Sequence, residues 1–367
     1  MSEIEPKWIK DVRDIKENHD KCVDYTNYYN GYSVLEKKDL NNETPEIFLV
    51  AGNRTGGKSF FFKRLLSLMR IHHGHKFLWI TRKITQVKGA AQSFYGDIRD
   101  CDDLCGEWDV DSYVRNVTAV LYHGEIIGYF TYINYAADLK EISNMFNDVG
   151  CIVKDEFQSE TNEYCTDEII KIRSIHKSVS RGFGKQSRYC PLICMGNQTS
   201  ILNPYYVALG IHKRLRPDTR FLRGEGYVLQ VFFNKQASDK SKASAFERAF
   251  GQDEYANSSN ENIFMDNTSF ILKKDTSRMK PQFSIGIENK WYGVFYSREG
   301  FYVCNQKIQG RLKYALDLES HNSETLMMRR SDPIFSQLKI YFDNGKFWFE
   351  NIECKNACFA LFEYCII

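Results

Sequence analysis

Short apolar runs alternate with helical patterns through the first part of the chain. Most of these runs end in a polar or charged residue, and their continuous apolar character is typical of strands that are buried on both faces. A helical pattern starts at about Lys58, between the first two runs. This strand–helix–strand order predicts a mostly parallel sheet with crossover helices. The runs that we interpret as strands are Ile47–Gly52, Lys76–Arg82, Val149–Lys154 and Cys190–Asn197.

The C-terminal part of the chain has a different pattern. From about Met265 onward, aromatic and β-branched residues alternate with polar ones, which predicts antiparallel strands. We expect hairpin turns at Glu299-Gly300 and at Asp343-Asn344-Gly345, and a closing helix over the tail Glu353–Ile367. A separate hairpin is predicted earlier, where Thr118–Tyr135 turns at His123-Gly124. The C-terminal segments that we expect to carry strands are Thr268–Lys274, Gln282–Gln306 and Leu338–Ile352.

Length and composition set broad limits. The chain has 367 residues, enough for two domains, and a net charge of +2, so contact with nucleic acid would depend on local basic patches. The 11 cysteines are scattered without the spacing of a zinc site, and we expect reduced thiols. The sequence HHGH at His72–His75 is interpreted as a solvated turn. The charged start and the lack of an apolar run of ~20 residues predict a soluble intracellular protein without a membrane segment.

One motif has clear chemistry. Residues Gly52–Ser59 read GNRTGGKS and satisfy the pattern G-x-x-x-x-G-K-[ST] in full. In this pattern the backbone N–H groups surround the phosphates of a nucleotide, the lysine reaches the β and γ phosphates, and the hydroxyl binds Mg²⁺. The motif follows a predicted strand and opens a predicted helix, which is the context that it requires. We expect the nucleotide to be bound by Gly52, Thr55, Gly56, Gly57, Lys58 and Ser59.

Two acids, Asp155 and Glu156, directly follow the predicted strand Val149–Lys154. A P-loop enzyme needs an acid at a strand end to hold the Mg²⁺ shell, and a second acid is suited to orient the attacking water. The pair favours a hydrolysing ATPase over a small-molecule kinase, although an exposed acidic turn is the simpler alternative. Lys154 stands where an apolar residue is usual, and we expect it to reach solvent or DNA.

Two basic clusters and one asparagine are further candidates. Lys171–Arg188 contains six Lys or Arg residues and no acid, and a second cluster lies within Lys213–Arg223. Such clusters could supply an arginine finger, contact DNA or a neighbouring subunit, or simply form a solvated surface. Asn197 ends its predicted strand, where it could sense the γ-phosphate or merely form a turn.

The order of these motifs resembles the DNA-packaging (encapsidation) ATPases of phi29-like phages. The resemblance extends over most of the chain from about Ile47 onward. The first 45 residues are longer than the usual start of that family, and we assign no chemistry to them. The segments that carry the resemblance are the P-loop, FLWITRK, the hairpin, CIVKDEF, SVSR, ICMGNQTSILNPYY, RPDTRF and FSIGIENKWYGVFY.

The resemblance implies an α/β fold with a defined domain order. An N-terminal extension (1–45) would precede an ATPase domain (46–234) of the ASCE type, meaning additional strand and catalytic glutamate, with a mostly parallel sheet. A short helical linker (235–264) would lead to an α+β RNase H-like domain (265–367) similar to that of large terminase subunits. The central strands of this domain carry no carboxylates, and Glu288, Asp343 and Glu350 lie at strand ends or in a turn. We therefore expect a vestigial nuclease that does not cut DNA.

The resemblance also implies roles for single residues. Arg181 lies where the family has its trans-acting arginine finger, with Arg188 and Lys185 as rivals, and Asn197 falls at a sensing position. In the nucleotide site, Lys58 and Ser59 match the Walker A residues, Asp155 the Walker B acid and Glu156 the catalytic glutamate. The candidates for DNA contact are Arg82, Lys83 and Lys88.

The partners implied are those of a packaging motor. Five subunits would form a ring at the portal vertex of an empty capsid, in the host cell cytoplasm, and pump double-stranded DNA inward with ATP and Mg²⁺. The C-terminal domain would dock onto the portal, the capsid or a structural RNA.

Two other functions stay open from the sequence. One is a P-loop kinase or GTPase-like switch, which is opposed by the Asp155-Glu156 pair and by the lack of an N-K-x-D motif. The other is a terminase with an active nuclease, which the missing carboxylates oppose.

Overall fold

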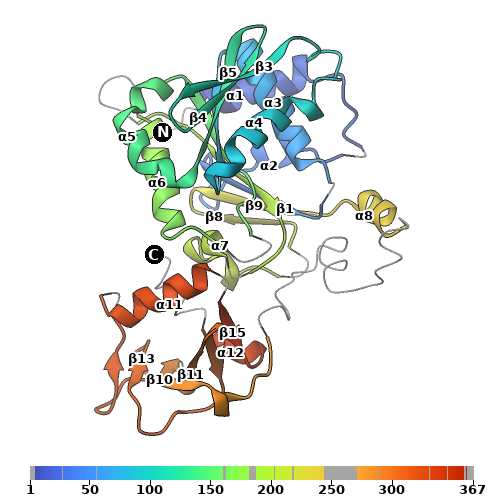
Figure 1. Ribbon diagram of the computed structural model, residues 1–367. Coiled ribbons are helices and arrows are strands. Elements are labelled where there is room, and N and C mark those ends of the chain that lie inside the picture. The colour runs from blue at the N-terminus through green and yellow to red at the C-terminus, as the bar shows by residue number, and fades with distance from the viewer. Residues whose placement is uncertain are drawn as a thin grey trace. The chain divides into compact units, whose positions relative to one another are not determined.

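The computed structural model describes residues 5–26, 28–54, 56–159, 163–181, 187–201, 203–216, 219–243, 271–287, 289–329, 331–344, 346–358 and 361. The chain forms two compact units, each with its own sheet, which can be followed by colour in Figure 1. The larger unit consists of Met1–Gln158, Ile170–Gln198 and Leu215–Ile263. The smaller unit consists of Ser159–Ile169, Thr199–Arg214 and Phe264–Ile367.

The sheet of the larger unit has the strand order β3-β4-β5-β2-β6-β7-β1-β9-β8. The strands from β5 to β9 in this order are parallel, and antiparallel strands lie at both edges. This confirms the mostly parallel sheet and the hairpin at His123-Gly124. The strands are β1 (Ile47–Gly52), β2 (Lys76–Thr81), β3 (Trp108–Val114), β4 (Val117–Tyr122), β5 (Glu125–Tyr132), β6 (Val149–Lys154), β7 (Leu192–Asn197), β8 (Phe221–Gly224) and β9 (Tyr227–Phe232).

The order of the central strands defines the type of sheet. Strand β1 leads into the loop Gly52–Ser59, and β6 leads into Asp155 and Glu156. Strand β7 lies between them and pairs in parallel with both. The additional strand is therefore present between the P-loop strand and the acidic strand, and it ends in Asn197.

Helices cover both faces of this sheet. Figure 1 shows α3 (Lys58–His73) and α4 (Val87–Phe94) on one side and α5 (Ala136–Glu141) and α6 (Glu168–Val179) on the other. Because side chains alternate along a strand, each central strand contributes to two cores. Phe48 and Val50 of β1, for example, share a core with the aromatic residues of α3.

The residues before β1 belong to the larger unit. They form α1 (Lys7–Asp14), a π-helical turn (Ile15–His19) and α2 (Tyr32–Leu35). The apolar side chains of α1 lie in the same core as α3. The turn predicted for HHGH is confirmed at Gly74, but it is not simply solvated: His75 Nε2 lies 2.6 Å from Asp11 Oδ2 of α1.

The smaller unit has the strand order β14-β13-β10-β11-β12-β15. Strands β10, β11 and β12 form an antiparallel meander, with the predicted turn at Glu299-Gly300, while β13 runs parallel to β10 and β14 parallel to β13. The order of β14, β13, β10, β11 and β12 agrees with the RNase H-like domain that the resemblance implies, and β15 adds a parallel strand beside β12. The strands are β10 (Lys280–Ile287), β11 (Lys290–Ser297), β12 (Gly300–Cys304), β13 (Lys313–Ala315), β14 (Leu326–Met327) and β15 (Phe347–Phe349).

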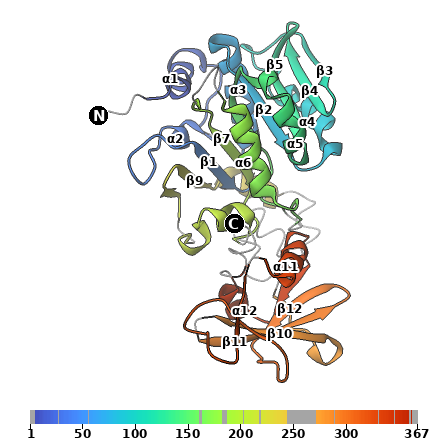
Figure 2. The ribbon, with the colours of Figure 1, turned by 90° about the vertical axis from the view of Figure 1, so that its left-hand side faces the viewer.

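The strand predicted before Asp343 is wrong. The segment forms the helix α11 (Pro333–Asp343), seen in Figure 2, with a proline in its first turn. Phe335, Leu338 and Phe342 recur at helical spacing and are all buried, and this periodicity outweighs the β propensity of the sequence. The start of the closing helix is confirmed as α12 (Ile352–Ala357). For the strand predicted at Thr268–Lys274, Ile271 forms a single bridge to Phe349 and residues 268–270 lie outside the described residues.

Part of the predicted linker is helical in α8 (Lys235–Lys242), and residues 244–264 lie outside the described residues. A further short helix is α7 (Pro204–Ala208). Among the helices that the structure describes, none has both the length and the apolar character needed to span a bilayer.

Candidate active site

The loop after β1 is fixed by a left-handed glycine and by contacts with the end of β9. Gly57 has a φ of 91°, in the left-handed region that glycine adopts without a steric penalty. Gly52 has no space for a side chain, because a Cβ there would lie 2.3 Å from the Phe232 carbonyl oxygen of β9. The Asn53 side chain accepts a hydrogen bond from the Asn234 N–H at 2.9 Å and donates to the Asn234 carbonyl at 3.0 Å. The loop is therefore tied to the end of β9. Thr55 lies outside the described residues.

Lys58 is held inside this loop. Its ammonium donates to the carbonyl oxygens of Asn53 at 2.7 Å and Gly52 at 3.2 Å. Burial lowers the pKa of Lys58 to about 8, and the nearby charge of Asp155 opposes that shift. The lysine lies at the N-terminus of α3, where unpaired backbone N–H groups already favour an anion. The loop is thus arranged to bind phosphate.

The two acids follow β6 in a constrained turn. Glu156 has a φ of 49°, which is unusual for a residue with a side chain, and its N–H donates to Asp155 Oδ1 at 3.0 Å. Burial and the charge of Glu156 together raise the pKa of Asp155. A cation would relieve this repulsion. The expectation that Lys154 reaches solvent or DNA is wrong, because its side chain is fully buried and donates to the Asp155 carbonyl at 2.7 Å.

Arg82 supports the same turn from β2. Its Nη2 donates to the carbonyl oxygens of Glu156 at 2.8 Å and Phe157 at 3.3 Å, and the residue is only 9% exposed. The sequence did not predict this positioning contact, because it joins two segments that are far apart in the chain. Lys83 and Lys88 are exposed and Arg82 is buried, and the contact of these three residues with DNA stays a prediction.

A cavity of ≈ 970 Å³ brings these parts together. Its walls come from the P-loop, from the turn after β6 and from the end of β7. A fourth wall comes from the segment before β1, to which no sequence motif assigns chemistry; its aromatic-rich sequence DYTNYYNGY is the signal in the sequence. The predicted site residues that line the cavity are Gly56, Gly57, Lys58, Ser59, Asp155, Glu156 and Asn197. The residues of the fourth wall are Cys22, Val23, Asp24 and Tyr28.

Two of the arginine-finger candidates, Arg181 and Arg188, lie outside this lining. Arg181 is exposed and follows the C-terminal end of α6. Arg188 is half-buried, and its Nη2 donates to the Val179 carbonyl at 2.9 Å within the same subunit. Lys185 lies outside the described residues. The structure therefore does not bring Arg181 to the cavity of its own chain.

A P-loop strand, an acidic strand and an additional strand between them define a P-loop ATPase of the ASCE class. A sequence model of the podovirus DNA encapsidation protein (Gp16) family matches residues 23–367. The chain belongs to this family.

Individual relatives agree with that assignment. The chain is 23% identical over 323 residues to a DNA packaging protein of Bacillus phage B103, covering 86% of this chain and 95% of that protein. It is 22% identical over 349 residues to a DNA packaging protein of Bacillus phage phi29, covering 93% and 98%. Its fold is similar to the Phi-28 gp11 DNA packaging motor, with a TM-score of 0.54, 15% identity and coverage of 92% and 98%. For the Phi-29 viral genome packaging motor the TM-score is 0.50, with 20% identity and coverage of 93% and 100%.

Proposed function

We propose that this chain is the ATP-hydrolysing subunit of a motor that drives double-stranded viral DNA into a preformed capsid. The observation that carries the proposal is the single cavity in which the P-loop meets Asp155, Glu156 and Asn197. Membership of the encapsidation family supports DNA transport as the process that this ATPase drives.

The residues of the cavity fit ATP with Mg²⁺. Lys58 and the N–H groups at the start of α3 would bind the phosphates. The Ser59 hydroxyl and the Asp155 carboxylate are the hard oxygen ligands that Mg²⁺ prefers, and both line the cavity. Bound Mg²⁺ would neutralise phosphate charge during transfer. Glu156 would orient the attacking water, and Asn197, at the end of the additional strand, would contact the γ-phosphate or that water.

Among the described residues, the cations that line the cavity are Arg54 and Lys58, and both belong to the P-loop segment. Phosphoryl transfer in P-loop enzymes is accelerated by an arginine that lies opposite the P-loop. Arg181 is exposed and does not line its own cavity, so a neighbouring copy is its natural target. We propose a homo-oligomeric ring of five subunits, as in the resemblance above, which acts at the portal vertex in the host cytoplasm.

The smaller unit would act by docking, onto the portal, the capsid or a structural RNA, and not by cutting DNA. Among the residues that the structure describes, no three His, Cys, Asp or Glu side chains are grouped to hold a metal ion. The residue at the centre of β10, the first strand of the meander, is Ser284 and not a carboxylate. Its hydroxyl accepts a hydrogen bond from the Ile308 N–H at 2.9 Å. Incubation of the full chain with DNA and Mn²⁺ or Mg²⁺ should leave the DNA intact; reproducible cleavage by the purified protein would contradict this assignment.

The motor function is tested by stimulation of the ATPase. Hydrolysis by the full chain should rise on adding double-stranded DNA together with portal-bearing capsids, and DNA should become protected from nuclease in an ATP-dependent way. Lys58→Ala should abolish both effects. ATP hydrolysis that is indifferent to DNA and capsids would instead indicate a switch or a small-molecule enzyme.

A further inference from the structure

The fourth wall of the cavity, formed by the segment before β1, includes an aromatic residue that phosphate binding does not need. Lys58, Ser59, Asp155 and Glu156 account for the triphosphate and its metal ion. The cavity of ≈ 970 Å³ is at the upper end of the ~300–1,000 Å³ range of small-molecule sites, so it has room for a whole nucleotide. Around the first turn of α3 it reaches a second, aromatic region.

Two aromatic rings form that region. Tyr28 and Phe60 both line the cavity, with ring centroids 6.1 Å apart and an interplanar angle of 37°. Phe60 follows Ser59 in α3, and consecutive helical side chains are separated by about 100° around the axis. The Phe60 ring therefore lies beside the phosphate end and does not overlap it. More than half of the Tyr28 surface is exposed, so its ring is accessible to a ligand.

The segment that carries Tyr28 is fixed to the P-loop. The Tyr29 N–H donates to the Gly56 carbonyl at 3.0 Å. The fully buried Tyr29 hydroxyl donates to Gln230 Oε1 of β9 at 2.7 Å. A Cβ placed on Gly57 would lie only 3.5 Å from the Cβ of Tyr28, so the two backbones are in close contact. These contacts fix the position of the segment that carries Tyr28 relative to the P-loop.

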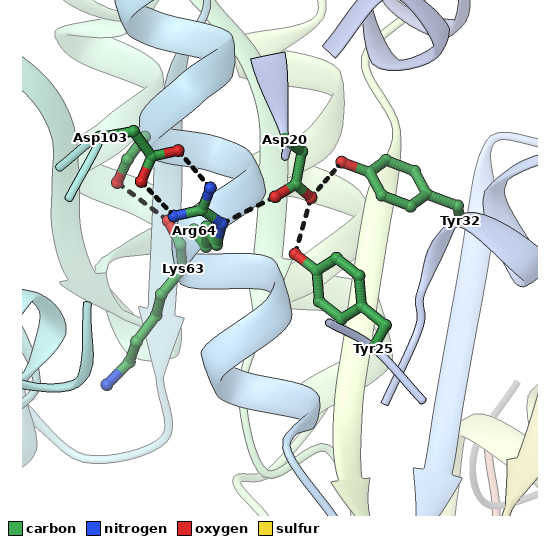
Figure 3. A network of polar contacts seen from close by, with 7 residues as sticks. Asp20, Tyr25, Tyr32, Lys63, Arg64 and Asp103 are labelled. Carbon is green, nitrogen blue, oxygen red and sulfur yellow. Dashed lines mark hydrogen bonds and ion pairs between the residues drawn. The ribbon is translucent and has the colours of Figure 1, made fainter. Parts of the chain in front are cut away.

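A buried polar network, shown in Figure 3, anchors the same segment to α3. Asp20 Oδ1 accepts from Arg64 Nε at 2.8 Å, and Asp20 Oδ2 accepts from the hydroxyls of Tyr25 and Tyr32, each at 2.6 Å. Arg64 Nη1 also donates to Asp103 Oδ1 at 2.6 Å. The segment is therefore a built wall of the site, because Asp20 connects Tyr25 and Tyr32 to Arg64 of α3 and Tyr29 is bonded to the P-loop.

We propose that Tyr28 and Phe60 form the subsite for the purine base of the bound nucleotide, with the Tyr28 ring stacking on the base. This inference rests on the proposed ATPase function. A flat, weakly polar ring system is the part of a nucleotide that an aromatic side chain binds best, and such stacking is sequence-tolerant because every base has a π-face. Asp24, the acid of this wall, already accepts two hydrogen bonds from Thr26, so stacking is the main contact that the wall offers.

The test separates the base from the phosphates. Binding of ATP and of inorganic tripolyphosphate, each with Mg²⁺, is measured for the full-length wild type, Tyr28→Ala, Tyr28→Phe and the control Phe233→Ala. Phe233 is an exposed aromatic residue outside the cavity lining. We expect Tyr28→Ala to weaken ATP binding about tenfold, with tripolyphosphate binding changed less than about twofold. Tyr28→Phe and Phe233→Ala should bind both ligands like the wild type.

A gain-of-signal variant gives a second readout. In Tyr28→Trp, ATP should quench the added tryptophan fluorescence, whereas tripolyphosphate should not. Unchanged ATP affinity in Tyr28→Ala, or an equal loss for ATP and tripolyphosphate, would overturn the base subsite; the equal loss would show that Tyr28 only shapes the P-loop. A wild type that binds and hydrolyses no ATP would instead refute the proposed function, so the two failures differ.

Discussion

Glu156 combines an unusual backbone with the position expected of a water-orienting acid. Its left-handed φ is stabilised by hydrogen bonds on both sides: its own N–H donates to Asp155, and its carbonyl accepts from the buried Arg82. Residues in such conformations persist where their surroundings hold them in place, and they concentrate at functional sites. The geometry therefore places a constrained carboxylate beside the phosphate loop.

Replacing Glu156 by Gln should separate binding from hydrolysis. The amide keeps the size of the side chain, and Lys58, Ser59 and Asp155 still bind the phosphates, so ATP affinity should stay within about threefold of the wild type. Turnover should fall by at least ~10²-fold, because the attacking water loses the carboxylate that we propose orients it. Steady-state ATPase assays and equilibrium ATP binding measure the two effects, with the exposed Glu125→Gln as control. Wild-type turnover in Glu156→Gln would remove this residue from the mechanism.

At the scale of elements, the segment before β1 is joined to α3 by charges that are out of water. The Arg64 side chain is 0% exposed and that of Asp20 is 1% exposed. When Asp20 is removed, Arg64 keeps its ion pair with Asp103, so the loss is smaller than the ~3–5 kcal/mol of an uncompensated buried charge. A lost hydrogen bond to a charged group typically costs about 1.5–3 kcal/mol. That is a large fraction of the ~5–15 kcal/mol by which domains are stable.

Asp20→Asn should therefore destabilise the larger unit by about 1.5–3 kcal/mol, because Arg64 keeps Asp103 as a partner. The change would be seen as a lower urea midpoint when unfolding is followed by circular dichroism. Asp100→Asn, whose side chain is 88% exposed, is the matched control and should have little effect. If both variants unfold at the same urea concentration as the wild type, the network in Figure 3 does not stabilise the fold.

The contact between α6 and the start of β1 should be sensitive to pH. Burial disfavours the charged form of His176, but the Glu46 carboxylate and the Cys190 carbonyl outweigh it and raise the pKa of His176 above its usual value near 6.5. Because the pKa of His176 is higher in the folded state than in the unfolded state, protonated His176 stabilises the fold below pH 6.5. This stabilisation is lost as the pH rises through the folded-state pKa. His176→Gln should therefore lower Tm by about 1–3 °C more at pH 6 than at pH 8.5.

Calorimetry at the two pH values measures this difference. In a Glu46→Gln background the pH-dependent part of the His176→Gln effect should become smaller, because the amide introduced by that substitution accepts the Cys190 N–H but carries no charge, while the Cys190 carbonyl still contacts His176. A loss of the same size at both pH values would mean that His176 contributes packing and no charge interaction.

The same elements show how far the sequence predicts the structure. The P-loop, β1, β6 and β7 follow from contiguous patterns, and so does the meeting of Lys58 with Asp155, because parallel strands end at one edge of the sheet. Strand β9 was missed, because the arginine-rich segment before it is typical of an exposed loop and not of a buried strand. The place of Tyr28 in the cavity wall was missed, because the segment before β1 is joined to the P-loop by a contact of Tyr29 with Gly56 that no local pattern encodes. The helix α11 was mistaken for a strand because its apolar residues are also good strand formers.

At the scale of the whole molecule, one chain has most of an ATPase site but no cation opposite its P-loop among the described residues that line the cavity, apart from Arg54 of the loop itself and Lys58. Arg181 lies beyond the end of α6 and is exposed. Arg188, its rival, is bonded to the Val179 carbonyl, and using it would require breaking that bond. A ring of identical copies would supply each site with the Arg181 of its neighbour.

Mixing variants should reveal this sharing. Arginine fingers supply ~10³–10⁵ in rate in other P-loop enzymes, so Arg181→Ala alone should be nearly inactive while still binding ATP. Glu156→Gln alone should also be inactive. In mixed rings, some interfaces would combine an intact Glu156 from one subunit with an intact Arg181 from the next, and partial ATPase activity should return. Arg188→Ala serves as the matched control. If Arg188 has only a structural role, this variant should keep its ATPase activity. Mixtures that form rings but never regain hydrolysis would refute an arginine supplied in trans, and rescue seen with Arg188→Ala instead would transfer the role to Arg188.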